Sequence, residues 1–334
     1  MQKATESLRD PFLSPEFAVA VDSVRSDARV AVLAEGPEIV GFFPFQRGRL
    51  GIGVPIGAGL SNCQGLIHAP AVEWDPRELL RACKVSVWQF DHLVDGQRPF
   101  ECYAAALAPS PVIDLTDGFA VYQQQLRLKS PRFYRDLNSN MRKLERDAGE
   151  LRSVADSRDL AGLRALMGWK SDQYRRNRWI SVFDRPWVVD LVHHLFDIHG
   201  DWFGGQLSLL YAGETPVAAT FDLRSGHVVA GWFAAYDTRF SRRSPGLIHL
   251  LLKAEAVAAL GVRLIDMGKG NDPYKQRLKS HDLFVAEGMA ARGPLLAGAH
   301  RVLSGATRRA GAQIRKHPHL FRATDQVLRR CGRI

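Results

Sequence analysis

Residues 231–278, GWFAAYDTRFSRRSPGLIHLLLKAEAVAALGVRLIDMGKGNDPYKQRL, contain an apolar segment, a basic turn, a second apolar segment and a polar loop. The first apolar run predicts a strand over 228–236, and the spacing after the turn predicts an amphipathic helix followed by another strand. The turn carries Arg239, Arg242 and Arg243. A plain connection between a strand and a helix needs glycine or proline but no cluster of guanidinium groups, so the turn indicates an anion site.

The start of the predicted helix has the features of a phosphate-binding site. A helix N-terminus presents unpaired N–H groups and a partial positive charge. Pro245 removes no donor that the helix would use, and Gly246 lets a ligand approach the backbone closely. Arg242 and Arg243 can add bidentate contacts to phosphate oxygens. These features suit a pyrophosphate, and the alternative is a solvated basic turn capped by Ser244.

The order of strand, basic turn, helix and strand resembles the acetyl-coenzyme A site of the GNAT acyltransferases. Their phosphate turn follows the pattern Q/R-x-x-G-x-G/A, which Arg243 and Gly246 match and from which Ile248 departs. The SPG turn followed by RLIDMGKGNDPYKQRL resembles a narrower group, the FemAB-like tandem GNAT proteins of the CelD/BcsL type, named for cellulose biosynthesis. The resemblance extends over about residues 15–290.

The resemblance implies an α/β fold with a mixed sheet, in which two GNAT-like halves are followed by a basic helical tail. The sequences VAVLAEGPEIVGFFPF and LSLLYAGETPVAATFD, one in each half, are similar hairpins and agree with a duplication. We predict a degenerate GNAT-like half over 1–116, a solvated linking helix over 117–152, an acyl-CoA-binding half over 153–290 and the tail over 291–334.

The resemblance also implies acetyl-CoA or another acyl-CoA as co-substrate, and no metal. The strand before the turn is expected to separate from its neighbour, so that its backbone binds the pantetheine and its N–H groups stabilise the thioester oxyanion. For the small residues of this strand, tight sheet packing is the alternative explanation. The predicted cofactor-binding residues are Phe233, Ala234, Ala235, Arg242, Arg243, Ser244, Pro245, Gly246 and Leu247.

The loop DMGKGNDPYKQRL, residues 266–278, is the second concentration of reactive side chains. Acyl transfer from a thioester to an amine needs a base for the nucleophile and a proton donor for the departing thiolate. We predict Tyr274 as that donor, with Asp266 and Lys275 as the next catalytic candidates. The alternative is an ordinary turn at Asp272 with solvated charges.

The positive charge of the chain is concentrated at its C-terminal end. The net charge is +10, and residues 291–334 carry ten Lys or Arg side chains against one acid, Asp325. The rest of the chain is therefore almost neutral, which argues against a nucleic-acid partner. Arginines spread among apolar residues predict either a helix at a membrane surface or a helix docked on the body.

The cysteines and the hydropathy indicate an intracellular protein. Four cysteines at wide, irregular spacings predict neither a metal site nor a disulfide framework, and the sequence shows no signal peptide or membrane-spanning run. We therefore expect a cytoplasmic protein with peripheral contact at the inner membrane face through residues 291–334.

The predicted function is transfer of an acetyl or other acyl group from acyl-CoA to an amine or hydroxyl acceptor. By resemblance, the acceptor is a small molecule or saccharide that serves as a sugar, polysaccharide or envelope precursor. Two alternatives remain open. One is a FemAB-like aminoacyl transferase that uses aminoacyl-tRNA, and the other is a catalytically silent GNAT-like protein that binds at a membrane surface.

Overall fold

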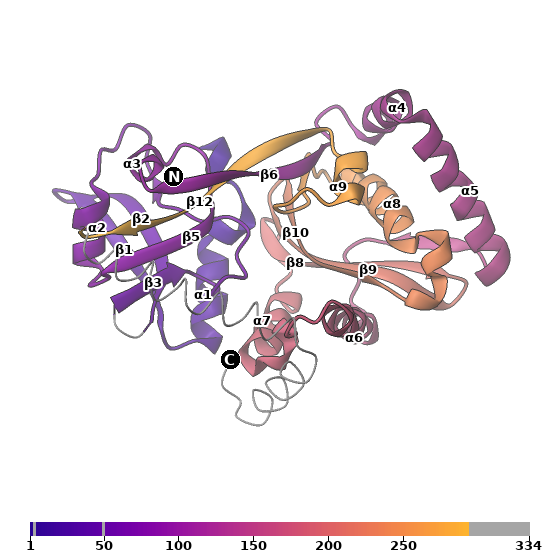
Figure 1. Cartoon of the computed structure of the whole chain (residues 1–334), viewed down its shortest axis with the longest axis horizontal. Coiled ribbons are helices and arrows are strands. Elements are labelled where there is room, and N and C mark those ends of the chain that lie inside the picture. The colour runs from indigo at the N-terminus through magenta and orange to yellow at the C-terminus, as the bar shows by residue number, and fades with distance from the viewer. Residues whose placement is uncertain (3–4, 49–50, 294–334) are drawn as a thin grey trace. The chain divides into compact units, whose positions relative to one another are not determined.

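The computed structural model describes residues 1–2, 5–48 and 51–293, shown in colour in Figure 1. Two compact units form, and neither is continuous in sequence. Unit 1 comprises Met1–Ala108, Tyr174–Leu191 and the residues from 284 onward, and unit 2 comprises Pro109–Gln173 and Val192–Leu283.

Unit 1 is built on strands in the order β1-β2-β3-β5-β12, with β4 beside β2. Its core is a group of aromatic side chains around Trp88 and Phe100, whose ring centroids lie 4.8 Å apart. The strands are β1 (Ala28–Glu35), β2 (Glu38–Arg47), β3 (Ile52–Pro55), β4 (Ile67–His68), β5 (Val87–Leu93) and β12 (His281–Ala291). The helices are α1 (Pro15–Val24), α2 (Pro76–Ala82) and α3 (Arg98–Glu101), with short 3-10 turns at Glu6–Leu8, Pro11–Leu13 and Val182–Asp184.

Unit 2 contains strands in the order β6-β11-β10-β9-β8-β7, and β6 pairs with β12 so that one mixed sheet results. The strands are β6 (Ala104–Asp114), β7 (Leu151–Val154), β8 (Phe203–Ala212), β9 (Thr215–Ser225), β10 (Val228–Tyr236) and β11 (Leu264–Asp266). The helices are α4 (Phe119–Lys129), α5 (Pro131–Ala148), α6 (Leu160–Arg176), the 3-10 helix η6 (Thr238–Arg243), α8 (Pro245–Ala259) and α9 (Pro273–Leu278). A further helix, α7 (Pro186–Phe196), begins in unit 1 and ends in unit 2.

The two units pair their strands in the same order and sense. In unit 1, β1, β2 and β3 are antiparallel, β3 is parallel to β5, and β5 is antiparallel to β12. In unit 2, β8, β9 and β10 are antiparallel, β10 is parallel to β11, and β11 is antiparallel to β6. The last strand of each series is not next to the others in the sequence. In unit 2 the last strand, β6, precedes the other strands, and in unit 1 the last strand, β12, comes after all the strands of unit 2.

Helices cover both faces of the unit 2 sheet (Figure 1). Consecutive strand residues point to opposite faces of the sheet. Leu209 of β8 therefore points to one face and Leu210 to the other. A Cβ atom on Gly162 of α6 would lie 2.6 Å from Leu209 Cδ1. Leu210 belongs instead to the core cluster that contains Ile248 and Leu251 of α8. The helix that follows the basic turn is therefore fixed against the sheet by its apolar face.

The structure has α4 and α5 where the sequence predicted one solvated helix over 117–152. Pro131 disfavours the helical conformation for the residue before it, and Ser130, with φ −142° and ψ 66°, ends α4. Both helices bury side chains in the unit 2 core. These side chains are Tyr122 and Leu126 of α4, and Leu137 and Leu144 of α5. They pack with α8 and so help to position the basic turn, which a solvated linker would not do.

Unit 2 also buries a charged pair between β9 and α8. Lys253 Nζ lies 2.8 Å from Asp222 Oδ2, and the two side chains are 2% and 1% exposed. Thr220 Oγ1 donates to the same carboxylate oxygen at 2.9 Å, and His249 Nε2 lies 3.4 Å from Thr220 Oγ1. Burial, together with the charge of Lys253, lowers the pKa of His249 to about 3. Pairing and hydrogen bonds offset the desolvation of such groups.

In the part of the chain that the structure describes, no helix is both long enough and apolar enough to cross a bilayer. The basic tail predicted over 291–334 lies outside the described residues from position 294 onward.

Candidate active site

β10 and β11 pair only over their first residues. The parallel ladder joins residues 228–230 to Leu264–Asp266, where β11 ends, whereas β10 continues to Tyr236. The register with β9 shifts between Gly231 and Phe233, and such a bulge bends a strand and redirects its backbone groups. The ladder with β11 therefore ends at residue 230, which agrees with the predicted separation of this strand from its neighbour. We refer to residues 231–236 of β10, on the side where β11 has ended, as the open edge.

Alternate residues of β10 face the open edge. The Asp237 N–H donates to Val217 O, next to β9, at 2.9 Å. Hydrogen-bonded pairs recur at every second residue of an antiparallel ladder, so Phe233 and Ala235 direct their backbone groups toward β9. Ala234 therefore presents its N–H and C=O to the open edge. Of the three residues predicted to hold the oxyanion, Ala234 is the one whose N–H points away from the ladder.

The junction between η6 and α8 leaves a backbone donor available. Ser244 adopts the left-handed conformation, with φ 53° and ψ 50°, and its side chain makes no capping hydrogen bond. Its carbonyl accepts hydrogen bonds from the N–H groups of Leu247 and Ile248 at 3.0 and 3.2 Å. Pro245 has no N–H. Among the described residues, the Gly246 N–H has no partner and is the free donor of this first turn.

The three arginines of the turn differ in their partners. Arg239 lies 2.5 Å from the carboxylate of Asp237, and Arg243 lies 2.7 Å from that of Asp147 on α5. Arg242 is exposed and makes no ion pair with the described residues. Arg242 is therefore the arginine available to an anion at the start of α8, whereas Arg243 is already neutralised by α5.

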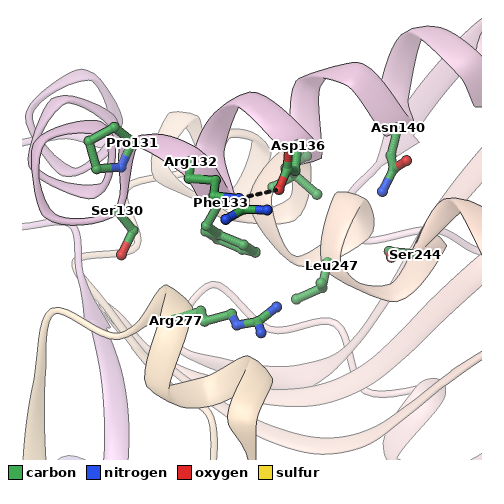
Figure 2. Close-up of a pocket in the computed structure, with 10 residues that line it drawn as sticks. Ser130, Pro131, Arg132, Phe133, Asp136, Asn140, Ser244, Leu247 and Arg277 are labelled. Atoms are coloured by element: carbon green, nitrogen blue, oxygen red, sulfur yellow. Dashed lines mark ion pairs between the residues drawn. The ribbon is translucent and has the colours of Figure 1, made fainter.

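A pocket of about 450 Å³ lies beside the start of α8 (Figure 2). Figure 2 shows Arg277 extending from α9 toward Leu247, with Phe133 of α5 above it. The Arg277 guanidinium carbon is 5.6 Å from the Phe133 ring centroid, and Arg132 lies 4.0 Å from Asp136. The lining residues are Ser130, Pro131, Arg132, Phe133, Asp136, Leu137, Asn140, Ser244, Leu247 and Arg277. The pocket thus combines two guanidinium groups with an aromatic ring.

Asp266 and Lys275 hold together the loop that follows β11. Asp266 Oδ1 accepts hydrogen bonds from Ser110 Oγ at 2.6 Å and from the Gly268 N–H at 2.7 Å. Lys275 Nζ donates to the carbonyls of Gly268 and Lys269, each at 2.9 Å. Burial lowers the pKa of the Lys275 ammonium. These contacts shape the loop, and the catalytic roles assigned from sequence to both residues stay predictions.

Tyr274 lies at the start of α9, between Asp266 and Lys275 in the sequence. The surrounding protein, together with the negative charge of Asp272, raises the pKa of Tyr274 to about 12. Lys275 Nζ is 6.0 Å from the centre of its ring. Tyr274 is therefore protonated at neutral pH, as the predicted proton donor must be. It also releases its proton less readily than an ordinary tyrosine with a pKa of about 10.

Lys170 of α6 is a candidate that the sequence did not indicate. Its Nζ donates to Ala234 O at 3.3 Å, across 64 positions of sequence. Burial lowers the pKa of Lys170 to about 8, the charge of Lys275 adds to this effect, and Asp272 opposes it. Groups with a perturbed pKa beside a ligand-binding edge are candidates for acid–base chemistry. The sequence GWKSDQYRR carries no motif for such a role, because the contact with β10 exists only in the fold.

Within the described ranges, no group of three or more His, Cys, Asp or Glu side chains is arranged to hold a metal ion. Cys63, Cys83 and Cys102 are free cysteines, and burial raises the pKa of the Cys83 thiol to about 11.

Comparison with known proteins agrees with this geometry. The sequence model of the acetyltransferase (GNAT) domain, a family of the CelD/BcsL type, matches residues 131–276. No curated protein matches the sequence.

Solved structures share the fold at low sequence identity. The C-terminal domain (DUF2156) of an Agrobacterium fabrum protein named for lysylphosphatidylglycerol synthetase has a TM-score of 0.53 at 11% identity, covering 87% of this chain and 90% of that one. FemX has a TM-score of 0.52 at 9% identity, covering 82% and 90%. A protein of unknown function from Bacteroides thetaiotaomicron has a TM-score of 0.53 at 11% identity, covering 85% and 91%.

The family match spans the segment in which the site was found. It includes the open edge of β10, the η6 turn, α8, β11 and the start of α9. Over residues 131–276 this chain is therefore similar to the acetyltransferase domain of the GNAT family, whose members are acyl-CoA-dependent transferases.

Proposed function

We propose that this protein transfers an acetyl or other acyl group from acyl-CoA to an amine or hydroxyl of a sugar, polysaccharide or envelope precursor. The observation that carries the proposal is the separation of β10 from β11 after a three-residue ladder. The backbone groups of Ala234 then face the open edge, and the N-terminus of α8 follows that edge. An extended thioester with a pyrophosphate at one end needs both features.

The open edge is suited to hold the reactive end of the co-substrate. The pantetheine amides would pair with β10 as a neighbouring strand does, and the Ala234 N–H would bind the thioester carbonyl oxygen. A preorganised donor of this kind stabilises the negative charge that develops on that oxygen. Holding the thioester beside the acceptor replaces a bimolecular encounter with a local one.

The pyrophosphate would bind at the start of α8. The Gly246 N–H and the Arg242 guanidinium are the donors available there, and a Cβ on Gly246 would lie 3.2 Å from Tyr236 Cδ1. Arg277 and Arg132 line the adjacent pocket of about 450 Å³ and suit further phosphate or adenosine groups. Arg243 would contribute after leaving Asp147, or by binding phosphate and carboxylate together.

The similar strand series of the two units support a further proposal, that the chain contains two GNAT-like halves. β1 and β2 occupy in unit 1 the positions that β8 and β9 occupy in unit 2, and these are the hairpins whose sequences are similar. The second half carries the basic turn, so we assign acyl-CoA binding to it. The boundaries 1–116 and 153–290 stay predictions of domain organisation.

The test of this function is binding of coenzyme A by isothermal titration calorimetry. Arg242→Ala removes a charge-assisted contact of about 1.5–3 kcal/mol, so the Kd should rise by roughly 10- to 150-fold. Arg239→Ala is the matched control, because Arg239 lies in the same turn but is paired with Asp237. It should leave the Kd within about threefold of the wild-type value.

Two results would contradict the proposal. If Arg242→Ala and Arg239→Ala bind coenzyme A as the wild type does, the turn is not the pyrophosphate site. If the wild type does not bind coenzyme A at all, the acyl-CoA assignment fails, and the FemAB-like aminoacyl transferase predicted from sequence becomes the leading alternative.

A further inference from the structure

Lys170 places an amine at the open edge. Its Nζ lies 3.3 Å from Ala234 O. The N–H and C=O of one strand residue point to the same side, so Lys170 is adjacent to the position where the Ala234 N–H would hold a thioester oxygen. α6 brings it there from the face of the sheet opposite α8.

Charged groups around Lys170 come from the loop after β11 and from α9. Lys275 approaches from α9, with its Nζ held by two loop carbonyls, and Asp272 precedes α9. Burial and Lys275 lower the pKa of Lys170 to about 8, against the opposing effect of Asp272. At neutral pH a larger fraction of the molecules then carries a neutral amine at this position than at an ordinary lysine, whose pKa is about 10.4.

We propose that Lys170 carries the proton during acyl transfer, an inference that rests on the proposed function. The neutral Nζ takes the proton from the acceptor amine or hydroxyl as that group bonds to the thioester carbon. The carbonyl electron pair moves to oxygen, which the Ala234 N–H stabilises. The electron pair on oxygen then re-forms the carbonyl as the C–S bond breaks, the pair of that bond goes to sulfur, and the Lys170 ammonium gives its proton to the thiolate.

The proton affinities of the groups favour Lys170 over Tyr274 in this step. A cysteine thiol has a pKa of about 8.5, and an unactivated alkyl thiol a somewhat higher one, so the Lys170 ammonium can give its proton to the departing thiolate without a large cost. A proton carrier works best when its pKa lies near the operating pH. Burial and the charge of Asp272 raise the pKa of Tyr274 to about 12, so Tyr274 gives its proton to a thiolate less readily than Lys170 does.

The first experiment follows thiol release from acetyl-CoA, with water as the acceptor, between pH 6 and pH 9.5. Lys170→Met should lower kcat by about 10²–10⁴-fold with KM little changed, and should abolish the rise of kcat through about pH 8. Lys170→Arg should fail equally, because a guanidinium does not give up its proton. Lys143→Met, an exposed lysine of α5, is the matched control and should behave as the wild type. Full activity of either Lys170 variant would overturn the proposal.

A second measurement needs no turnover. Acetic anhydride labels neutral amines, and peptide mass spectrometry gives the labelling rate of Lys170. The rate should rise with pH around a midpoint of about 8 and fall at least tenfold at a coenzyme A concentration of about 100 Kd. Labelling of Lys143 should not respond to coenzyme A.

The labelling result also separates the two proposals. If calorimetry shows that coenzyme A binds but the labelling of Lys170 is unchanged, Lys170 is not at the thioester and its proposed role is wrong, while the proposed function stands. If coenzyme A does not bind, the proposed function fails, and the role of Lys170 fails with it.

Discussion

Tyr274 and Lys170 are alternative donors of the proton that the departing thiolate takes up. Tyr274→Phe removes the hydroxyl and keeps the ring, so it tests the proton alone. Because Lys170 is the carrier with the better matched pKa, we expect Tyr274→Phe to keep kcat within about tenfold of the wild type. Steady-state kinetics at pH 7.5 with acetyl-CoA would show this. A loss of about 10²-fold or more, with unchanged affinity for coenzyme A, would restore Tyr274 as the proton donor.

Single residues also show where sequence reasoning reached its limit. The sequence was sufficient to locate the basic turn from its arginines, Pro245 and Gly246, but it did not predict the left-handed conformation of Ser244. The partner of Arg243 is Asp147, 96 positions away, and the partner of Lys170 is the backbone of β10. No local pattern encodes such contacts, because they depend on how α5 and α6 pack on the sheet.

His249, in the buried polar group between β9 and α8, makes the free energy of unfolding sensitive to acid. His249 has a pKa of about 3 in the fold and about 6.5 in the unfolded chain. The unfolded chain therefore binds more protons as the pH falls from 6.5 toward 3, and the fold loses about 1.4 kcal/mol per pH unit from this group. Between pH 7.5 and pH 5 the loss should be about 2 kcal/mol.

His249→Gln should remove that part of the pH dependence. We expect the free energy of unfolding of the variant, from urea titrations followed by tryptophan fluorescence, to fall less between pH 7.5 and pH 5 than that of the wild type, by about 2 kcal/mol. His194→Gln, at an exposed position of α7, should leave the wild-type slope unchanged. An unaltered slope in His249→Gln would show that this histidine does not control acid stability.

The elements around the basic turn, β10, α8 and β11, were easier to predict than α4 and α5, which support the turn. The periodicity of apolar residues was enough for β10, α8 and β11, because each buries one face or both. The break between α4 and α5 was signalled by Pro131, yet their role in the core was hidden by the many charges on α5. Those charges lie on the outer face, while Leu137 and Leu144 are buried.

The two units of the chain exchange a strand, so neither unit is one continuous segment of the sequence. β6 completes the sheet of unit 2 and β12 that of unit 1. Cutting the chain near 116 would remove β12 from unit 1. The repeated hairpins predicted a duplication, but the exchange could not be read from them, since strand pairing over such separations leaves no local signal.

The basic tail gives a prediction for the full-length protein. Residues 295–334 lie beyond the described part, so the expectation rests on their arginine-rich, apolar-interspersed sequence. In liposome flotation with anionic vesicles, the full chain should float, and a chain ending at residue 294 should not. Flotation that truncation leaves unchanged, or a full chain that does not float, would exclude the membrane role.

The open edge of β10 has a consequence for handling the protein. Backbone groups at the edge of a strand are a template for another chain, and the contact of Lys170 with Ala234 O occupies one of these groups at the open edge. A bound co-substrate would occupy the same groups. We therefore expect samples stored with coenzyme A to resist aggregation longer than samples stored alone, and Lys170→Met to shorten that shelf life. The feature that admits the substrate is also the point at which the empty molecule is most exposed to self-association.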